Sequence, residues 1–247
     1  MSTQKVIFFV LIMTVLVALL LAGTKLATAP LADRNEDIFN KRQILGAVAG
    51  PMMDAGKDVN ALSGEEVLAI FSEQVDQRIV GASGEPMDVS GMEAIDVDMA
   101  KERKKDPSER MYPVYEVNLD GKSYYIFSVR GTGLWDAIWG NIALEEDLNT
   151  VAGVSFDHAG ETPGLGAEIK DNAAWKAQFV GKKIYDGERF VSVYVRKGGA
   201  IDKEHEVDGL SGATVTADGV TKMLYEGLKA YEPFMEDADA STGMNLK

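Results

Sequence analysis

A stretch of small and hydroxyl-bearing residues near the C-terminus carries the clearest chemical signal in this chain. Residues 208–216 read Asp-Gly-Leu-Ser-Gly-Ala-Thr-Val-Thr. Three small side chains precede the hydroxyls of Thr214 and Thr216, which fall at the predicted start of the last helix. The first turn of a helix offers unpaired backbone N–H groups and a partial positive charge, and both attract phosphate. The stretch therefore indicates a phosphate site, with an ordinary Ser/Thr helix cap after a glycine turn as the alternative.

A second glycine-containing stretch follows a predicted strand. Its sequence, residues 161–166, is Glu-Thr-Pro-Gly-Leu-Gly. Pro163 restricts the backbone, while Gly164 and Gly166 permit positive φ and let a ligand approach the main chain. Leu165 would then project from a rigid loop, where it could cover a flat aromatic ring. A plain tight turn is the alternative.

Two further segments could contribute to the same site. Residues 130–135, Arg-Gly-Thr-Gly-Leu-Trp, lack the third glycine and the helix that a dinucleotide-binding fingerprint requires. Trp135 could stack on an aromatic ligand, or it could be a core residue. Arg196 and Lys197, which precede two glycines, could bring positive charge to a phosphate or a reduced ring. The alternative is that both charges are simply solvated.

Composition limits the chemistry that the chain can perform. The 247 residues include no cysteine and two histidines, His158 and His205. This excludes iron–sulfur clusters, Cys-ligated zinc, c-type haem, thiol catalysis and disulfides, and it argues against multi-His metal sites. Carboxylates could hold a hard cation, but we predict no metal site, and any redox role then needs an organic cofactor. The net charge of −14 argues against nucleic acid, which is bound by clustered Lys and Arg.

The N-terminus has the length and composition of a membrane anchor. Residues 6–23 contain no charge and one hydroxyl, that of Thr14. As a helix, this run would span about 27 Å, close to the thickness of the hydrocarbon core. The candidate cleavage site at 27–29 is followed by Pro30, which favours an uncleaved single-span anchor over residues 1–26. Basic residues lie on both sides of the run, so charge leaves its orientation open.

The rest of the chain has the pattern of an α+β domain. Period-two hydrophobicity surrounds the turn dipeptides Asp120-Gly121 and Asp186-Gly187, which favour hairpins. Helical periodicity occurs at both ends, and Ser63 with Glu66 forms a capping box. We predict an antiparallel sheet with flanking helices. The predicted elements are a helical lead-in over about 35–80, strands at 112–119, 122–129, 138–144, 151–156, 184–185 and 190–195, and helices at 172–180 and 214–231, with residues 27–33 as a linker.

The first stretch resembles the covalent flavinylation signature of the FMN-binding domain family, Asp-Gly-x-Ser/Thr-Gly-Ala-Thr. The matching residues are Asp208, Gly209, Ser211, Gly212, Ala213 and Thr214. The loop at residues 161–166 also matches a motif of this family, in the expected order along the chain. The resemblance implies that a separate flavin transferase esterifies Thr214 with the phosphate of FMN, giving one covalent FMN per chain.

Within that family, the chain is most similar to the C subunits of Na⁺-translocating NADH:quinone oxidoreductases. The resemblance rests on Gly133-Leu134-Trp135, on residues 160–166, and on Trp175-Lys176 ahead of Gly181-Lys182. The G subunits of Rnf-type electron-transfer complexes share two of these motifs and are one alternative. A flavin-free, membrane-anchored assembly module, in which the Thr214 stretch only caps a helix, is the other.

The resemblance implies an electron carrier within a larger enzyme. Electrons from NADH would pass through FAD and iron–sulfur centres to this FMN, then to flavins in the B-type partner chain and on to quinone. The B, D, E and F chains of the complex would be partners, and this chain alone would complete no reaction. The sequence has no evident paired carboxylates or nucleophile–base pair, so no catalytic residue is expected. The family also implies that residues 27–247 form one extracytoplasmic domain at the periplasmic side of the inner membrane, with its flavin-binding core at about 110–232.

The resemblance further assigns the residues around the phosphodiester at Thr214. We expect the amides of Val215, Thr216 and Ala217, and the hydroxyl of Ser211 or Thr216, as hydrogen-bond donors. Thr214 has no nearby His or Cys to activate it, which makes an external transferase chemically sensible.

The isoalloxazine ring is expected to lie against exposed apolar side chains. Leu165 would cover one side of the ring, with Leu134 or Trp135 nearby. The full set of expected cofactor-binding residues is Thr214, Asp208, Gly209, Leu210, Ser211, Gly212, Ala213, Val215, Thr216, Glu161, Thr162, Gly164, Leu165, Leu134, Trp135 and Lys197.

Overall fold

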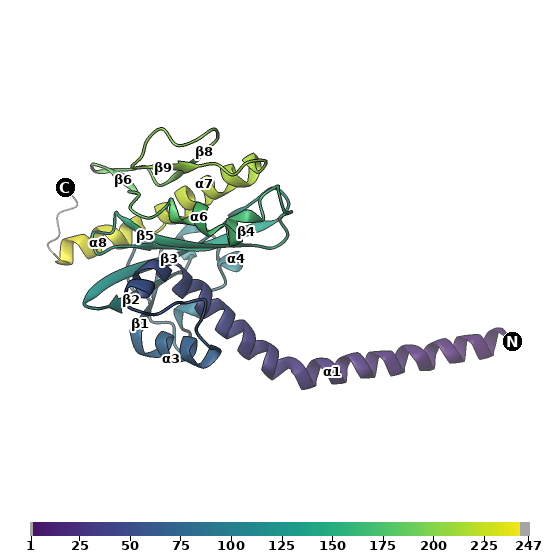
Figure 1. The fold of residues 1–247 in the computed structure, drawn as a ribbon. Coiled ribbons are helices and arrows are strands. Elements are labelled where there is room, and N and C mark those ends of the chain that lie inside the picture. The colour runs from purple at the N-terminus through teal and green to yellow at the C-terminus, as the bar shows by residue number, and fades with distance from the viewer. Residues whose placement is uncertain (1, 243–247) are drawn as a thin grey trace. The chain divides into compact units, whose positions relative to one another are not determined.

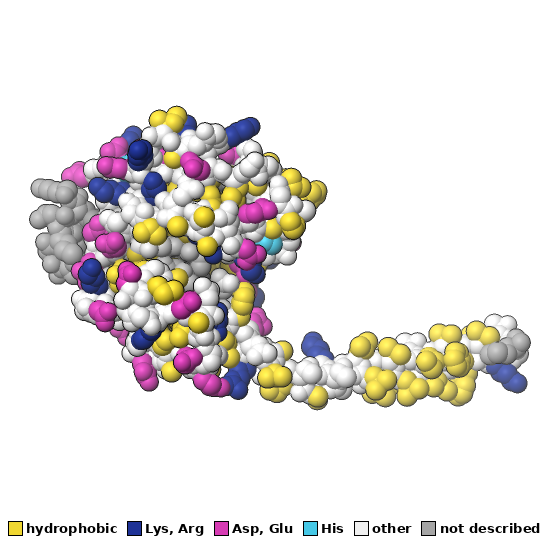
Figure 2. Space-filling view, in the orientation of Figure 1, with side chains coloured by type: hydrophobic (Ala, Val, Ile, Leu, Met, Phe, Trp, Pro, Cys, Tyr) yellow, Lys and Arg dark blue, Asp and Glu magenta, His cyan; other side chains and the backbone are white. Residues whose placement is uncertain are grey.

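The computed structural model describes residues 2–242 and opens with one long helix, α1 (Thr3–Gly46). Among the described residues, α1 is the one helix long and apolar enough to cross a membrane. Figure 2 shows hydrophobic side chains gathered along its N-terminal part. The predicted linker at 27–33 and the separate helix start near residue 35 are wrong, because both lie within α1. This segment is rich in helix-forming Ala and Leu, and Pro30 removes a single helical hydrogen bond without ending the helix.

The compact unit begins at Lys41, and helices lead into it. The helix α2 (Ala49–Asp54) is followed by α3 (Gly64–Gln74), and the predicted capping box between Ser63 and Glu66 is confirmed. Residues 75–80, expected at the end of the helical lead-in, instead form a strand, β1 (Val75–Val80). Its β-branched residues favour the extended state, and it pairs along its whole length with the next strand.

Five consecutive strands form one antiparallel sheet in the order β1-β2-β3-β4-β5. The remaining strands are β2 (Tyr112–Leu119), β3 (Lys122–Thr132), β4 (Ala137–Leu144) and β5 (Val151–His158), and short helices η1 (Ala94–Asp96), α4 (Met99–Glu102) and η2 (Pro107–Glu109) join β1 to β2. Asp120 and Gly121 have φ values of 50° and 82°, as a type I′ turn requires. The first two predicted hairpins are therefore confirmed, and with them the α+β class.

Helix α7 (Thr214–Lys229) packs on one face of the sheet, while α3 lies on the other (Figure 1). The buried stripe of α7 consists of Val220, Met223, Leu224 and Leu228, as its helical spacing predicted. Two glycines allow close approach to β3. A Cβ at Gly131 would lie 2.7 Å from Met223, and one at Gly219 would overlap the carbonyl of Thr132. A final helix, α8 (Glu232–Thr242), follows.

Short elements connect β5 to α7. They are α5 (Glu168–Asp171), α6 (Ala173–Ala177), β6 (Tyr185–Asp186), β7 (Arg189–Phe190), β8 (Tyr194–Arg196) and β9 (Glu206–Asp208). The hairpin at Asp186-Gly187 is present but short, since the predicted strand at 190–195 breaks at Ser192, whose φ is 62°. As a result β8 pairs with β9, in parallel. The helix predicted at 172–180 is shorter than expected, because α6 ends at Ala177 and residues 178–180 form a turn. The rings of Trp175 and Phe179 pack edge to face.

Close packing between β4 and β5 gives a test of the sheet. We expect Gly140→Ala to lower the free energy of unfolding by about 1–3 kcal/mol, because the added Cβ overlaps the Ser155 carbonyl and the Phe156 ring. Gly160→Ala is the matched control, since its Cβ would enter open space. Chemical denaturation of the full chain in detergent measures both, and equal stabilities would contradict this packing.

Candidate functional site

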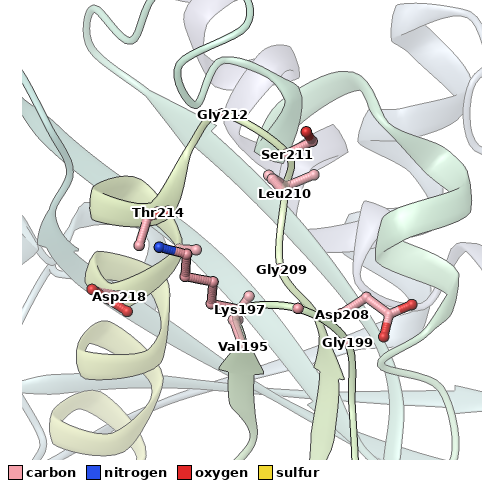
Figure 3. Close-up of a pocket in the computed structure, with 12 residues that line it drawn as sticks. Val195, Lys197, Gly199, Asp208, Gly209, Leu210, Ser211, Gly212, Thr214 and Asp218 are labelled. Atoms are coloured by element: carbon pink, nitrogen blue, oxygen red, sulfur yellow. The ribbon is translucent and has the colours of Figure 1, made fainter.

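A cavity of about 490 Å³ lies between the ends of β8 and β9 and the first turn of α7 (Figure 3). It brings together two segments that the sequence separates. The lining residues are Val195, Lys197, Gly198, Gly199, Asp208, Gly209, Leu210, Ser211, Gly212, Thr214, Ala217 and Asp218. Lys197 reaches toward Thr214 in this cavity, whereas the Asp208 carboxylate points away from both (Figure 3). The predicted meeting of Lys197 with the Asp208 stretch is thus present in the structure.

Hydrogen bonds hold Asp208 in place at the start of the 208–214 loop. Its carbonyl accepts a 2.7 Å bond from the indole N–H of Trp175, and its amide donates to the side chain of Gln178 at 2.9 Å. Its carboxylate accepts a 2.7 Å bond from the amide of Ala200. Because these groups are already bonded to the protein, Asp208 shapes the cavity rather than supplying a free carboxylate to it.

The first turn of α7 has no side-chain cap. Ala213 occupies the N-cap position, and the first backbone bond within the helix runs from the amide of Ala217 to the carbonyl of Ala213, at 2.9 Å. The amides of Thr214, Val215 and Thr216 therefore have no acceptor within the helix. The alternative in which a Ser or Thr side chain caps this helix is therefore wrong. The expectation that the Ala217 amide donates to a phosphate is also wrong, because that amide is bonded to Ala213.

The two threonines of the stretch have different surroundings. Thr214 is half-buried and lines the cavity. Thr216 is fully buried, and its hydroxyl lies 2.7 Å from Oε2 of Glu161 and 3.0 Å from the carbonyl oxygen of Leu165. The expected role of the Thr216 hydroxyl as a phosphate donor is therefore wrong, because that hydroxyl is bonded inside the protein.

Glu161 is the acceptor at the centre of this region. Glu161 is 5% exposed, and its carboxylate accepts bonds from the amides of Trp135 (3.0 Å), Leu134 (3.3 Å) and Asp136 (3.4 Å), besides the Thr216 hydroxyl. Burial opposes ionisation, but these hydrogen bonds outweigh it and hold the pKa of Glu161 below its usual range. The sequence placed Glu161 in the loop expected to face the ring. No local pattern indicated that its carboxylate joins the 133–136 loop to α7.

Three loops come together at this site, namely residues 133–136, 161–166 and 209–214. Glycines permit the contact. A Cβ at Gly133 would lie 2.5 Å from Oε1 of Glu161, and a Cβ at Gly212, whose φ is 81°, would lie 2.6 Å from the carbonyl oxygen of Gly164. A second carboxylate, that of Glu168, accepts bonds from the amides of Gly164 and Gly166. The loop that carries Leu165 is thus held at both ends.

Exposed apolar side chains project from these loops and from the first turn of α7. Trp135 is 66% exposed and Leu165 is 39% exposed, and Leu134 and Val215 are also exposed. Figure 2 shows hydrophobic side chains gathered at the end of the compact unit where α7 begins. Large apolar side chains clustered on a surface mark a binding face. The structure therefore brings the two predicted ring-facing loops together beside Thr214, with Thr162 and Gly164 in the same loop as Leu165.

The loop that carries Lys197 is held by an ion pair that sequence reasoning missed. Glu206 is buried, pairs with Arg196, and accepts bonds from the amides of Ile201 (2.8 Å) and Asp202 (3.0 Å). The hydrogen bond from Arg196 lowers the pKa of Glu206 to about 2, against the effect of burial. Arg196 is therefore a partner of Glu206 rather than a free charge for a ligand, and Lys197 is the cation of the cavity.

The two histidines of the chain lie away from the cavity, and the described residues offer no metal site. Within residues 2–242, no group of three or more His, Asp or Glu side chains is arranged to hold a metal ion. Neither His158 nor His205 lines the cavity. A general base for Thr214 is therefore not supplied by an imidazole of this chain.

Comparison with known proteins agrees with this geometry. Residues 133–229, which include all three loops, match the family model of the FMN-binding domain. The C subunit of the Na⁺-translocating NADH-quinone reductase of Pseudomonas aeruginosa is 34% identical over an alignment that covers 91% of this chain and 90% of that protein. The crystal structure of the C subunit from Parabacteroides distasonis has a TM-score of 0.71 at 34% identity, covering 83% of this chain and 95% of that one. NqrC from Shewanella oneidensis has a TM-score of 0.67 at 29% identity, covering 84% and 98%.

The Arg196–Glu206 pair predicts a pH-dependent stability. The pKa of Glu206 falls from 4.5 to about 2 on folding, so the unfolded chain takes up its proton first as the pH falls. Glu206→Gln should lower the free energy of unfolding at pH 7 by about 1–3 kcal/mol. The difference from wild type should shrink as the pH falls below about 4.5. Glu204→Gln, an exposed neighbour, is the control. A difference that stays constant down to pH 3 would argue against the pair.

Proposed function

Because the chain belongs to the family of C subunits of the Na⁺-translocating NADH-quinone reductase, we propose that it carries electrons in such a complex through FMN bonded to Thr214. The observation that carries the attachment site is the placement of Thr214. This residue lines an open cavity at an uncapped helix start, whereas Thr216, the other threonine of the 208–216 stretch, is buried. The 34% identity over nine-tenths of both chains favours this complex over an Rnf-type one.

The residues around Thr214 fit the two chemical parts of FMN. A phosphodiester needs donors and positive charge, and the amides of Val215 and Thr216 and the ammonium of Lys197 supply them. An aromatic ring needs apolar contacts, and Trp135 and Leu165 are exposed on the loops joined through Glu161 and Thr216. Once bound, FMN supplies the reversible electron transfer, and the protein supplies position and electrostatics.

The attachment step needs an enzyme and a flavin nucleotide with an activated phosphate. The Thr214 hydroxyl oxygen forms the bond to phosphorus, the leaving group departs with the electron pair of its own bond, and the hydroxyl proton is released. The net gain is FMN less one water. Since no histidine of this chain lines the cavity, we assign the activation of Thr214 to a separate flavin transferase.

The remaining parts of the proposal concern the membrane and the partners. We propose that residues 1–26 anchor the chain in the inner membrane and that residues 27–247 lie on the periplasmic side. The compact part of that region begins at Lys41, after the continuation of α1. The B, D, E and F chains of the complex are the proposed partners. Support for a membrane-anchored component of a larger reductase comes from the apolar part of α1 and from the family membership.

Intact mass tests the attachment directly. Full-length protein made together with a flavin transferase should gain the mass of FMN less one water. Thr214→Ala should lose that gain, because the acceptor oxygen is gone, while Ser72→Ala, which removes an exposed hydroxyl on α3 outside the signature, should keep it. An unchanged mass for the wild type would refute covalent attachment and favour a flavin-free module.

Leu165 tests the position of the ring. Leu165→Ala should change the reduction potential or the fluorescence of the attached flavin without preventing attachment, because it removes an apolar contact and admits water. Val180→Ala, an exposed aliphatic residue of α6's C-terminal flank, is the control. Identical potentials and spectra in the Leu165 variant would remove this residue from the ring contact.

A further inference from the structure

Thr216, the second threonine of the 208–216 stretch, has a role of its own. We propose that Glu161 and Thr216 form a buried clasp that positions Thr214 for modification, so that both act as positioning residues. The inference rests on the proposed attachment of FMN to Thr214. It gives the fully buried Thr216 a function that neither a helix cap nor a phosphate ligand can provide.

The clasp joins segments that are far apart in sequence. The Thr216 hydroxyl lies 2.7 Å from Oε2 of Glu161, which is 55 residues earlier, and 3.0 Å from the carbonyl oxygen of Leu165. It therefore ties the first turn of α7 to the loop that projects Leu165. The same carboxylate accepts the amides of Leu134, Trp135 and Asp136.

The first turn of α7 needs such a tie because its N-terminus has no other side-chain bond. A helix start is normally fixed by Ser, Thr, Asp or Asn at the N-cap position, where the side chain bonds an amide of the first turn. Here the N-cap is Ala213 and makes no side-chain bond. Thr216 stands three residues later and takes over the fixing of the turn through its bond to Glu161. Thr214 lies on that turn, so its direction depends on the clasp.

The chemistry of the clasp also separates the two hydroxyls. An ionised carboxylate only accepts, and its two oxygens have room for the four donors that converge on Glu161. The Thr216 hydroxyl is therefore held away from the cavity, and Thr214 is the hydroxyl left at its wall. Gly166 allows the close contact, since a Cβ there would overlap the Thr216 side chain. Which threonine receives FMN thus follows from burial and not from sequence position alone.

The test compares attachment rates in full-length variants made with a flavin transferase. Thr216→Val keeps the shape of the side chain and removes the hydroxyl, and it should slow the gain of flavin mass by about tenfold or more. Thr216→Ser restores the hydroxyl and should return the rate to within about twofold of wild type, as expected when position rather than bulk matters. Glu161→Ala combined with Thr216→Val should be no slower than the slower single variant, because both remove one clasp.

A control separates positioning from general destabilisation. Glu102→Gln alters another buried carboxylate, one that accepts the amide of Met111 at 2.9 Å and does not contact the three loops. It should keep the wild-type attachment rate even where its thermal midpoint falls as far as that of Thr216→Val.

The outcomes distinguish this inference from the function on which it rests. A folded Thr216→Val variant that gains flavin at the wild-type rate would overturn the clasp. A wild-type chain without any gain of mass would refute the proposed function itself. Should Thr216→Val not fold, Glu161→Asp decides, since it keeps the charge but shortens its reach to Thr216. A slowed rate then supports the clasp, and an unchanged rate overturns it.

Discussion

The functional end of this protein depends on one buried carboxylate. Glu161 is nearly inaccessible to water and is surrounded by three backbone amides and one hydroxyl, which come from two other segments of the chain. Separating any of these segments would leave a buried charge short of donors, which costs several kcal/mol. Because a carboxylate imposes no single direction on its donors, it can join the irregular loops at 133–136 and 161–166 to the first turn of α7. The loops therefore behave as one surface, and Thr214 lies on its edge.

The antiparallel sheet explains how these loops reach the same place. The β3–β4 turn contains residues 133–136, and Glu161 follows the C-terminal end of β5. Both therefore lie at the same end of the sheet. Helix α7 crosses onto β3 through glycine contacts that fix its height above the sheet, and its first turn therefore arrives beside both loops. Substitution of the glycines between α7 and β3 would shift the first turn of α7 without changing any residue of the site. The rigid sheet thus supplies position, and the loops supply chemistry.

Features set by local chemistry could be predicted from the sequence, and those set by distant contacts could not. The Asp120-Gly121 turn, the Ser63 capping box and the stripe of α7 depend on neighbours along the chain, and all three are confirmed. The strand β1 depends on pairing with β2, and the parallel β8–β9 pair depends on a break at Ser192. At the site, most of the signature residues that the sequence singled out line one cavity. Thr216 is buried and Thr214 lines the cavity because Thr216 bonds Glu161, a partner 55 residues away that no local pattern indicates.

The openness of the site is consistent with a covalent bond. A ligand held by contacts alone is usually enclosed, because most of its surface must be buried to offset the freedom it loses on binding. Here the cavity lies at the surface, and Trp135 on the neighbouring 133–136 loop is 66% exposed. Such a surface holds a flat aromatic group weakly but leaves one edge accessible to another redox centre. A covalent bond to Thr214 would retain the ligand without a closed pocket, so the ligand could stay bound while one of its edges remains exposed. On this view, the buried clasp and the open face belong together: the carboxylate keeps the attachment point fixed while the apolar side chains around it remain exposed.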